Sequence, residues 1–318
     1  MNNLLEMIKS GEKIVILPHD NIDGDAFCSA HALKMLIKSL GKEAVVLAES
    51  ESARQLEFLG LSCKVYESGE KYDFDTAVAI DCADKERLGQ RGAVFDAALK
   101  KAVIDHHKTN KGYGDINLIY PDAAAACQVV YNLFDEWKGE FSPDAATLLY
   151  CGIVTDTGGF RYSNTTPETL LAAAHLLKCG ADAEKIMTNI FETKPRAQFS
   201  VEAEAFRQTA FYHDGKTAIC KISQKMQESF GASDDDLSNI SSQLRCIEGV
   251  LVSATIKEKD DCQRISLRSK DLVDVAEICA HFGGGGHMRA AGATSSLSAE
   301  ETENELVRLI GESYERLH

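Results

Sequence analysis

The chain has 318 residues, of which 44% are hydrophobic and 26% are charged. This balance is typical of a folded globular protein, and the length predicts two domains that each bury a core of their own. The formal net charge of −15 repels long polyanions, which argues against a protein that tracks along duplex DNA. A small anionic substrate remains compatible with this charge if metal ions or a few arginines supply local positive charge.

The N-terminus and the cysteines indicate the compartment. The opening MNNLLEMIKSGEK lacks the basic and then apolar order of a signal peptide, and no apolar run approaches the roughly 18 residues of a membrane span. The ten cysteines are scattered singly without a CxxC pair, which favours free thiols in a reducing compartment over disulfides or a zinc ribbon. We therefore expect a cytoplasmic protein that does not bind membranes.

The first 180 residues alternate short apolar runs with helical patterns, which predicts a doubly wound parallel sheet of the α/β class. Strands are expected at 13–18, 43–48, 76–81 and 102–105, and helices at 26–40, 85–100, 123–137, 144–156 and 167–178.

The remaining chain predicts a second, smaller domain of mixed α/β type. A polar helical stretch at 181–205, interrupted by Pro195, is expected to connect the two parts. It is followed by a hairpin that turns at Asp214-Gly215, strands at 249–258 and 262–269, a helix at 272–282, a glycine run and a closing helix at 299–316. We predict domains at 1–185 and 207–318, joined by a helical linker at 186–206, with a cleft between them.

Carboxylates and imidazoles follow the predicted strands, at the edge where open α/β sheets bind ligands. A single aspartate at such a position is commonly a helix cap. Asp20 and Asp105 fit this role, or that of residues that support the metal ligands by hydrogen bonds. Helical His31, His175 and His281 are expected to be structural. The candidate set at strand and helix ends is His19, Asp23, Asp25, Asp81, His106, His107 and Asp156.

This donor set favours Mn²⁺ or Mg²⁺ over zinc, because no cysteine has the spacing of a zinc ligand. The four aspartates of the set would repel one another and raise their pKa values, whereas two divalent ions would neutralise them. Two metals roughly 3.5–4 Å apart form the usual clamp for in-line attack on phosphorus. We expect Asp81 to bridge both ions, since it stands alone after a central strand, and Gly24 to let the backbone turn between Asp23 and Asp25.

Several motifs in this order resemble the DHH phosphoesterase superfamily. They are HDNIDGDA at 19–26, IDCAD at 80–84, VIDHHK at 103–108 and GIVTDTGGF at 152–160. The stretch GGGGHMRAAG at 283–292, preceded by RISLRS, is similar to the DHH-associated C-terminal domain of the same proteins. The resemblance covers nearly the whole chain, which in size and domain content is similar to the nanoRNase/pAp phosphatase group. Ile22 stands where the family often has proline.

The resemblance implies an enzyme with two Mn²⁺ ions, with Mg²⁺ or Co²⁺ as alternatives. Its substrates would be short oligoribonucleotides, 3′-phosphoadenosine 5′-phosphate (pAp), or linear and cyclic dinucleotides, and a homodimer is also implied. His107 would face the scissile phosphate, stabilising charge or assisting proton transfer. The implied ligands are His19, Asp23 and Asp81 for one ion, and Asp25, Asp81, His106 and Asp156 for the other.

The second domain is expected to hold the end of the substrate. Its glycine run offers backbone N–H groups that no side chain blocks, although such runs are more often flexible loops. The planar guanidinium group of arginine binds phosphate, and histidine binds phosphate or stacks on a base. A clamp of such residues at one end of the cleft would limit substrates to a few nucleotides. Arg161 either reaches the substrate or forms a structural ion pair. The expected substrate-binding residues are Arg268, Ser269, Gly284, Gly285, Gly286, His287 and Arg289.

Three alternative functions are compatible with parts of this pattern. An inorganic pyrophosphatase shares the N-terminal motifs but has no use for a nucleotide clamp, and a processive single-strand DNA exonuclease would need further oligonucleotide-binding domains. A nucleotide-binding sensor that has lost catalysis could lack one or more of the metal-site carboxylates. This chain has all of them, which argues against a sensor. The sequence leaves open the order of preference among the substrates and the polarity of attack.

Overall fold

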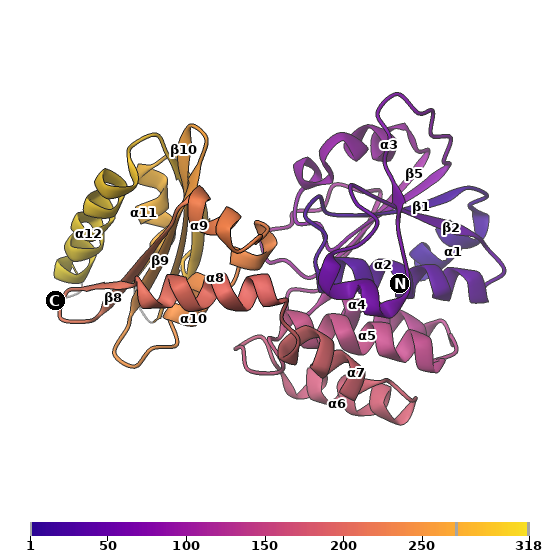
Figure 1. Cartoon of the computed structure of the whole chain (residues 1–318). Helices are drawn as coiled ribbons and strands as arrows, with labels where there is room; N and C mark the ends of the chain where they lie inside the picture. The colour runs from indigo at the N-terminus through magenta and orange to yellow at the C-terminus, as the bar shows by residue number, and fades with distance from the viewer. Residues whose placement is uncertain (1, 271–272, 317–318) are drawn as a thin grey trace. The chain divides into compact units, whose positions relative to one another are not determined.

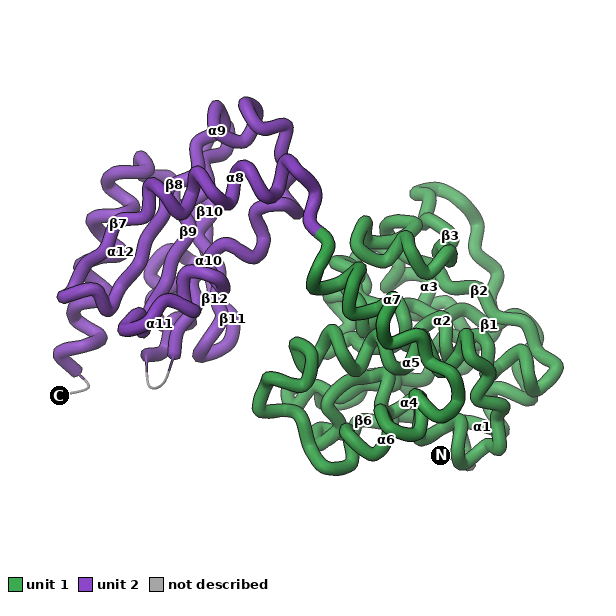
Figure 2. Tube along the Cα trace, turned by 60° about the horizontal axis from the view of Figure 1, so that its bottom comes forward, with its two compact units in different colours: residues 1–193 green, residues 194–318 purple. Residues whose placement is uncertain are grey.

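The computed structural model describes residues 2–270 and 273–316. The chain divides into two compact units, residues 1–193 and 194–318 (Figure 2). The division lies within the segment 186–206, for which the sequence predicts a linker. No helix in the described part of the chain is long and apolar enough to cross a membrane.

Unit 1 is built on a six-stranded parallel sheet with the order β3-β2-β1-β4-β5-β6. Because β1 and β4 are neighbours although β2 and β3 lie between them in sequence, the strand order reverses at this pair, where open sheets bind ligands. The strands are β1 (Ile14–Pro18), β2 (Ala44–Ala48), β3 (Lys64–Val65), β4 (Thr76–Ile80), β5 (Lys100–Asp105) and β6 (Ile116–Ile119).

Helices cover both faces of this sheet (Figure 1). Alternate residues of each central strand point to opposite faces: Ile14 and Ile16 pack with α2, α4 and α5, whereas Val15 and Leu17 pack with η2 and α3. Burial on both faces explains why β1 and β4 are apolar throughout. The helices of unit 1 are α1 (Asn2–Ser10), α2 (Gly24–Ser39), η1 (Arg54–Leu59), η2 (Lys85–Arg91), α3 (Gly92–Ala97), α4 (Ala126–Glu136), α5 (Pro143–Asp156), α6 (Pro167–Lys178), α7 (Ala183–Met187) and η3 (Thr188–Glu192).

The α/β class and the four predicted strands of unit 1 are confirmed, with two differences around them. The sequence analysis did not predict the short edge strands β3 and β6. The single helix expected at 85–100 is wrong: η2 is interrupted by Gly89 with φ 57° and ψ −138°, α3 ends at Ala97, and β5 already begins at Lys100. The left-handed conformation of Gly89 cannot continue a right-handed helix.

Unit 2 is built on a mixed six-stranded sheet with the order β11-β12-β10-β9-β8-β7, in which β8 and β9 are parallel and the other neighbours antiparallel. The predicted hairpin at Asp214-Gly215 joins β7 to β8. The strands are β7 (Ala210–Tyr212), β8 (Thr217–Ile222), β9 (Val252–Lys259), β10 (Cys262–Ser269), β11 (Gly285–His287) and β12 (Ala290–Ser295).

Helices also cover both faces of the second sheet. Val201 and Ala205 of α8 are buried with Ala218 and Cys220 of β8, so this helix belongs to the core of unit 2. The first position of the helix predicted at 272–282 lies outside the described residues, and α11 itself begins at Val275 after the N-cap Asp274. The helices of unit 2 are α8 (Arg196–Arg207), α9 (Gln224–Ser229), η4 (Asp235–Leu237), α10 (Ile240–Leu244), α11 (Val275–His281) and α12 (Ala299–Arg316).

Candidate active site

The predicted metal-binding residues converge at the carboxyl edge of the unit 1 sheet, from loops after β1, β4 and β5 and from the ends of α2 and α5. In the described part of the chain, three overlapping groups place possible ligand atoms within 4.8 Å of one another. The groups are His19, Asp23 and Asp81; Asp25, His106 and Asp156; and Asp81, Asp105, His106 and His107.

Asp81 lies at the centre of the site. One of its carboxylate oxygens, Oδ2, lies 3.8 Å from Nε2 of His19, and the other, Oδ1, lies 3.4 Å from Nε2 of His106. The backbone of Asp81 has a φ of 51°, a strained conformation for a residue other than glycine, and its N–H donates to the carbonyl of Ile104. Such strain costs about 1–3 kcal/mol and is concentrated at functional sites.

The first ligand group is positioned by the start of α2. Asp23 caps this helix, since its Oδ1 accepts hydrogen bonds from the N–H groups of Asp25 and Ala26 at 3.1 and 3.0 Å. Its Oδ2 lies 3.6 Å from Nε2 of His19. The cap thus orients the carboxylate so that one oxygen is fixed by the backbone and the other faces the imidazole.

Asp25 is fixed by backbone donors from a different part of the chain. Its Oδ2 and Oδ1 accept hydrogen bonds from the N–H groups of Ala126 and Cys127, at 2.5 and 2.9 Å. These are the first N–H groups of α4, so the carboxylate caps that helix and gains from the positive end of the helix dipole. The hydrogen bonds hold a buried carboxylate in place before any metal is bound.

Two glycines let α2, α4 and α5 approach closely enough to bring these carboxylates together. A Cβ atom on Gly24 would lie 2.5 Å from Oγ1 of Thr155, and one on Gly152 would lie 2.2 Å from Sγ of Cys127. The expectation that Gly24 turns the backbone is therefore wrong, because it is the first residue of α2 and has no left-handed φ. Its missing side chain is needed for close helix packing.

His106 directs its Nε2 at the carboxylates. Its Nδ1 lies 3.3 Å from the carbonyl oxygen of Ala123, which can only accept, so Nδ1 carries a proton and Nε2 is the ring nitrogen that a metal could bind. Nε2 lies 3.4 Å from Asp81 Oδ1, 3.7 Å from Asp156 Oδ2 and 3.9 Å from Asp25 Oδ2. An imidazole oriented in this way is ready to bind a metal.

The pKa shifts of the site residues indicate that the carboxylates have too little positive charge beside them. Burial, followed by repulsion from Asp81 and Asp156, raises the pKa of Asp25 well above its usual range. Burial also raises the pKa of Asp156 to about 6. Burial lowers the pKa of His106, but the attraction of Asp81 and Asp25 outweighs it and raises that pKa to about 10. Bound cations would relieve the repulsion among these carboxylates.

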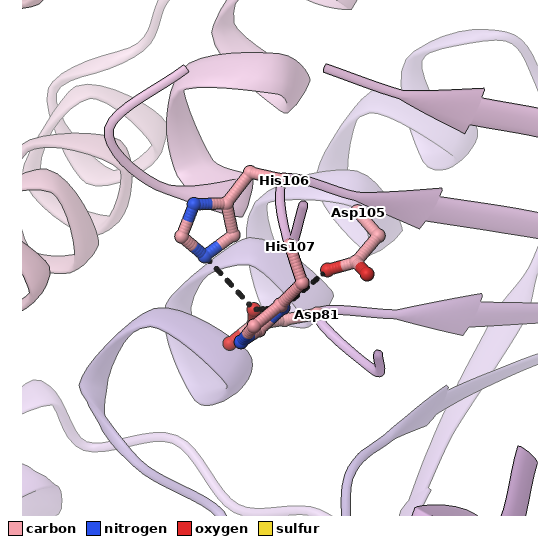
Figure 3. Close-up of side chains that lie close together, drawn as sticks. All are labelled: Asp81, Asp105, His106 and His107. Carbon is pink, nitrogen blue, oxygen red and sulfur yellow. Dashed lines mark hydrogen bonds and ion pairs between the residues drawn. The ribbon is translucent and has the colours of Figure 1, made fainter. Parts of the chain in front are cut away.

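His107 and Asp105 form a hydrogen-bonded pair beside Asp81 (Figure 3). Nδ1 of His107 lies 2.7 Å from Oδ1 of the fully buried Asp105, and Asp105 raises the pKa of His107. Nδ2 of Asn110 donates to the other oxygen of Asp105 at 2.6 Å. The sequence analysis missed Asn110, although it stands only three residues after His107 in VIDHHKTN.

Other residues singled out in the sequence have structural contacts. Asp20 accepts a hydrogen bond from the N–H of Asn21, as expected of a turn residue. Arg161 donates from Nε to the carbonyl of Gly158, and its guanidinium lies 5.6 Å from the ring centre of Phe191. The predicted structural histidines contact protein groups, with His31 near Cys63, His175 near Tyr131 and His281 paired with Glu305.

The last two glycines of the run in unit 2, Gly285 and Gly286, belong to the edge strand β11. A Cβ atom on Gly284 would lie 2.3 Å from the carbonyl oxygen of Gly292, and one on Gly286 would lie 2.6 Å from that of Ala290. The N–H of Gly284 donates to the carbonyl of Cys279 and caps α11. Close pairing with β12 therefore explains two of the glycines, and the N–H of Gly284 is already used within unit 2.

The other predicted clamp residues differ in their exposure. Ser269 is buried, and its hydroxyl donates to the carbonyl of Val273 at 2.7 Å, so it lies beneath the surface that it was predicted to form. Its N–H donates to the carbonyl of Arg289. Nη1 of Arg268 donates to the carbonyl of Leu267, whereas His287 and Arg289 are exposed. The structure thus gives Ser269 a supporting position under Arg289.

Carboxylates and imidazoles converge at the ligand-binding edge of the sheet, and cations would relieve the repulsion among the carboxylates. This arrangement is that of a metal-dependent hydrolase that acts on phosphoester bonds. Comparison with known families gives the same class. Residues 13–153 match the N-terminal domain of the DHH family, and residues 214–315 match the DHHA1 domain. The chain belongs to the DHH family.

Relatives are similar over nearly the whole chain. The bifunctional oligoribonuclease and PAP phosphatase NrnA of Thermus thermophilus is 33% identical over 299 residues, which cover 92% of this chain and 88% of that protein. The Bacillus subtilis protein of the same name is 28% identical over 92% of both chains. The crystal structure of an exopolyphosphatase-related protein from Bacteroides fragilis has a TM-score of 0.90 at 23% identity, covers 99% of this chain and 95% of that one, and shares the fold.

Proposed function

We propose that the chain hydrolyses short oligoribonucleotides to mononucleotides and removes phosphate from pAp to give AMP, with linear or cyclic dinucleotides as further substrates. The names of the relatives support this substrate class, since the similarity covers most of both chains. The observation that carries the proposal is the position of Asp81, whose two carboxylate oxygens face two separate groups of donor atoms.

In this proposal the site holds two divalent cations, with Mn²⁺ as the first candidate. The buried Oδ1 of Asp81 has no hydrogen-bond partner among the described residues, which supports a donor set that cations complete. Mixed carboxylate and imidazole donors suit Mn²⁺. His19, Asp23 and Asp81 would hold one ion, and Asp25, Asp81, His106 and Asp156 the other. The ions would supply positive charge to the phosphoryl oxygens and make a water more acidic.

His107 would act on the reacting phosphate itself. The hydrogen bond from Nδ1 to Asp105 leaves its Nε2 as the atom that can meet a substrate. Asp105 also raises the pKa of His107, which favours the protonated form of the imidazole. A protonated Nε2 can stabilise charge on the phosphoryl oxygens or donate a proton to the leaving oxygen.

Unit 2 would bind the terminal nucleotide of the substrate. The exposed His287 is the last residue of the edge strand β11 and the exposed Arg289 lies two residues after it, so a phosphate and a base could be contacted at one place. Arg268 would contribute from β10, and the backbone of Gly285 and Gly286 would let a ribose or phosphate approach closely. Ser269 would act from below by holding the backbone of Arg289.

A substrate panel tests the function. The full chain with Mn²⁺ is assayed on pAp, a labelled RNA dimer, longer RNA, cyclic di-AMP and pyrophosphate, with Asp81→Ala as the control. We expect release of AMP from pAp and of mononucleotides from the dimer, with kcat/KM falling as the RNA lengthens, and no activity in Asp81→Ala. Preferred hydrolysis of pyrophosphate, or activity that Asp81→Ala retains, would contradict the proposal.

A further inference from the structure

The chain segment 123–127, which leads from β6 into α4, holds two of the three residues in one proposed ligand group. The carboxylate of Asp25 accepts hydrogen bonds from the last two N–H groups of the segment, and Nδ1 of His106 lies against its first carbonyl. The third member of the group, Asp156, comes from the end of α5. A cation bound by all three therefore needs the end of α5 to be held at a fixed position relative to this segment.

The side chain of Asn164 makes this connection. Its Nδ2 donates to the carbonyl of Ala124 at 3.0 Å and to the carbonyl of Asp156 at 3.2 Å. Both partners can only accept, so the two hydrogens of the amide nitrogen are used, one on segment 123–127 and one on the last residue of α5. The carbonyl of Asp156 stands at a helix end, where it has no partner within the helix. One side chain thus satisfies this carbonyl and ties the two parts of the ligand group together.

The turn after α5 brings Asn164 back to this position. Gly158, Gly159 and Phe160 have φ values of 58, 70 and 63° in succession. This left-handed run reverses the chain, so that Asn164 contacts the residue eight positions before it. The conformation of Phe160 is strained, and strain of this kind persists only where the surrounding structure holds it, as is common at functional sites. The glycine-rich stretch after Asp156 therefore shapes the return of Asn164.

Asp156 depends on this connection more than the other carboxylates do. Asp23 and Asp25 each accept two backbone hydrogen bonds on their carboxylates. Within residues 2–270 and 273–316, no hydrogen bond reaches the carboxylate of Asp156, whose side chain is 32% exposed. The position of this carboxylate is therefore set through its backbone, and Asn164 is the side chain that holds that backbone.

We propose that Asn164 is a positioning residue of the metal site, which holds Asp156 where it can share one cation with Asp25 and His106. This inference rests on the proposed function, since it assumes that a cation binds to this group. Asn164 touches neither the cation nor the substrate, and it acts through Asp156. Replacement of groups that orient metal ligands commonly weakens metal binding about 10–100-fold.

A second polar side chain, Gln128, fixes segment 123–127 from within α4. Its Oε1 accepts hydrogen bonds from the N–H of Ala124 at 2.9 Å and from the hydroxyl of Thr169 at 3.0 Å. Ala124 is fully buried, so its N–H would have no partner without Gln128. Side chains therefore hold both backbone groups of Ala124, and Gln128 offers an independent way to disturb the segment that Asn164 binds.

Isothermal titration calorimetry of the full chain with Mn²⁺ tests this role, because it measures binding without turnover. Asp156→Asn identifies the binding step that depends on this ligand group. We expect Asn164→Ala to weaken the same step about 10–100-fold and to change the other step no more than about two-fold. Thr147→Ala is the matched control, because the hydroxyl of Thr147 donates to the carbonyl of Pro143 at 2.7 Å and accepts from the N–H of Asp182 at 3.1 Å, at the other end of α5. Both steps should be retained in this control.

Gln128→Met keeps the test decisive if Asn164→Ala does not fold. Methionine has a similar length but lacks the acceptor, so the same binding step should weaken. Urea denaturation without metal checks that each variant is folded. Two unchanged steps in the folded variants, or equal weakening of both steps, would overturn the role of Asn164 and leave the proposed function standing. An unmodified chain that binds no Mn²⁺, or two steps that both survive Asp156→Asn, would overturn the proposed ligand set and this inference with it.

Discussion

Nδ1 of His107 lies 2.7 Å from Oδ1 of Asp105, a carboxylate that is wholly buried and that Asn110 holds from its other side. This arrangement gives the imidazole one orientation and fixes a proton on its Nδ1, as the aspartate of a catalytic triad does for its histidine. His107 differs in this respect from the neighbouring His106, whose Nδ1 lies against a backbone carbonyl and not against a carboxylate.

Replacement of Asp105 should therefore impair turnover more than metal binding. Asp105→Asn removes the charge that raises the pKa of His107, and we expect kcat on pAp to fall about 10²–10⁴-fold. Mn²⁺ binding, measured by titration calorimetry, should change much less. Asp84→Asn is the matched control, because Asp84 caps η2 outside the site and asparagine caps equally well. Equal losses of kcat in both variants would contradict the assigned role.

The bridging position of Asp81 predicts an effect on both ions. Asp81→Asn should weaken both Mn²⁺ binding steps in calorimetry by about 100-fold or more, since one carboxylate serves both donor groups. Asp23→Asn removes a donor from only one group and should weaken one step while the other is retained. Two equally affected steps in Asp23→Asn, or one unaffected step in Asp81→Asn, would show that Asp81 does not bridge.

Close packing at Gly152 should be essential for the site. In Gly152→Ala the new methyl would overlap Sγ of Cys127 and lie 2.8 Å from Oδ1 of Asp25, so we expect a loss of about 1–3 kcal/mol in the free energy of unfolding and weaker metal binding. Gly92→Ala, with a helical φ and its nearest neighbouring atom at 4.0 Å, should be neutral or stabilising. Urea denaturation of the two variants distinguishes this effect from a general sensitivity of glycines.

His31 should make stability depend on pH. Burial lowers the pKa of His31 to about 4 in the folded chain, while the unfolded chain has its ordinary pKa of 6.5. Between these values the unfolded state binds more protons, so the stabilisation is complete above pH 6.5 and is lost as the pH falls toward 4, on the order of 3 kcal/mol in all. His31→Gln should flatten this part of the pH profile of urea denaturation. An unchanged difference between pH 7.5 and pH 5 would contradict the shift.

The substrate role of unit 2 predicts an effect on KM. Arg289 is exposed and lies far in sequence from every proposed metal ligand, so Arg289→Ala should raise KM for an RNA dimer at least about 10-fold and change kcat only a few-fold. Arg264→Ala, on the same sheet, serves as the control for a general loss of positive charge. A fall in kcat with unchanged KM would argue against a binding role for Arg289.

The sequence by itself determined the class of the fold and the set of residues that we propose as metal ligands. Apolar runs that alternate with helical patterns define parallel strands, and the polar residues that follow those runs must meet at one edge of the sheet. His19, Asp81 and His106 could be assigned for this reason, because parallel topology alone brings their strand ends together. Asp25 follows the first strand and Asp156 ends a helix in a glycine-rich turn, so both could be predicted from their positions, and the resemblance of their motifs to a known family supports this.

Only the tertiary structure decided how these residues are supported and what lies outside the site. The bond from Asp25 to α4 joins residues 101 positions apart, and the contact of Gly152 with Cys127 depends on how three helices pack, so neither leaves a local signal. Ser269 at the end of a strand gives no sign in sequence of whether its hydroxyl faces solvent or a backbone carbonyl. For the same reason, a helix as apolar as α6 is expected to be buried, and only the packed fold shows that one of its faces remains exposed.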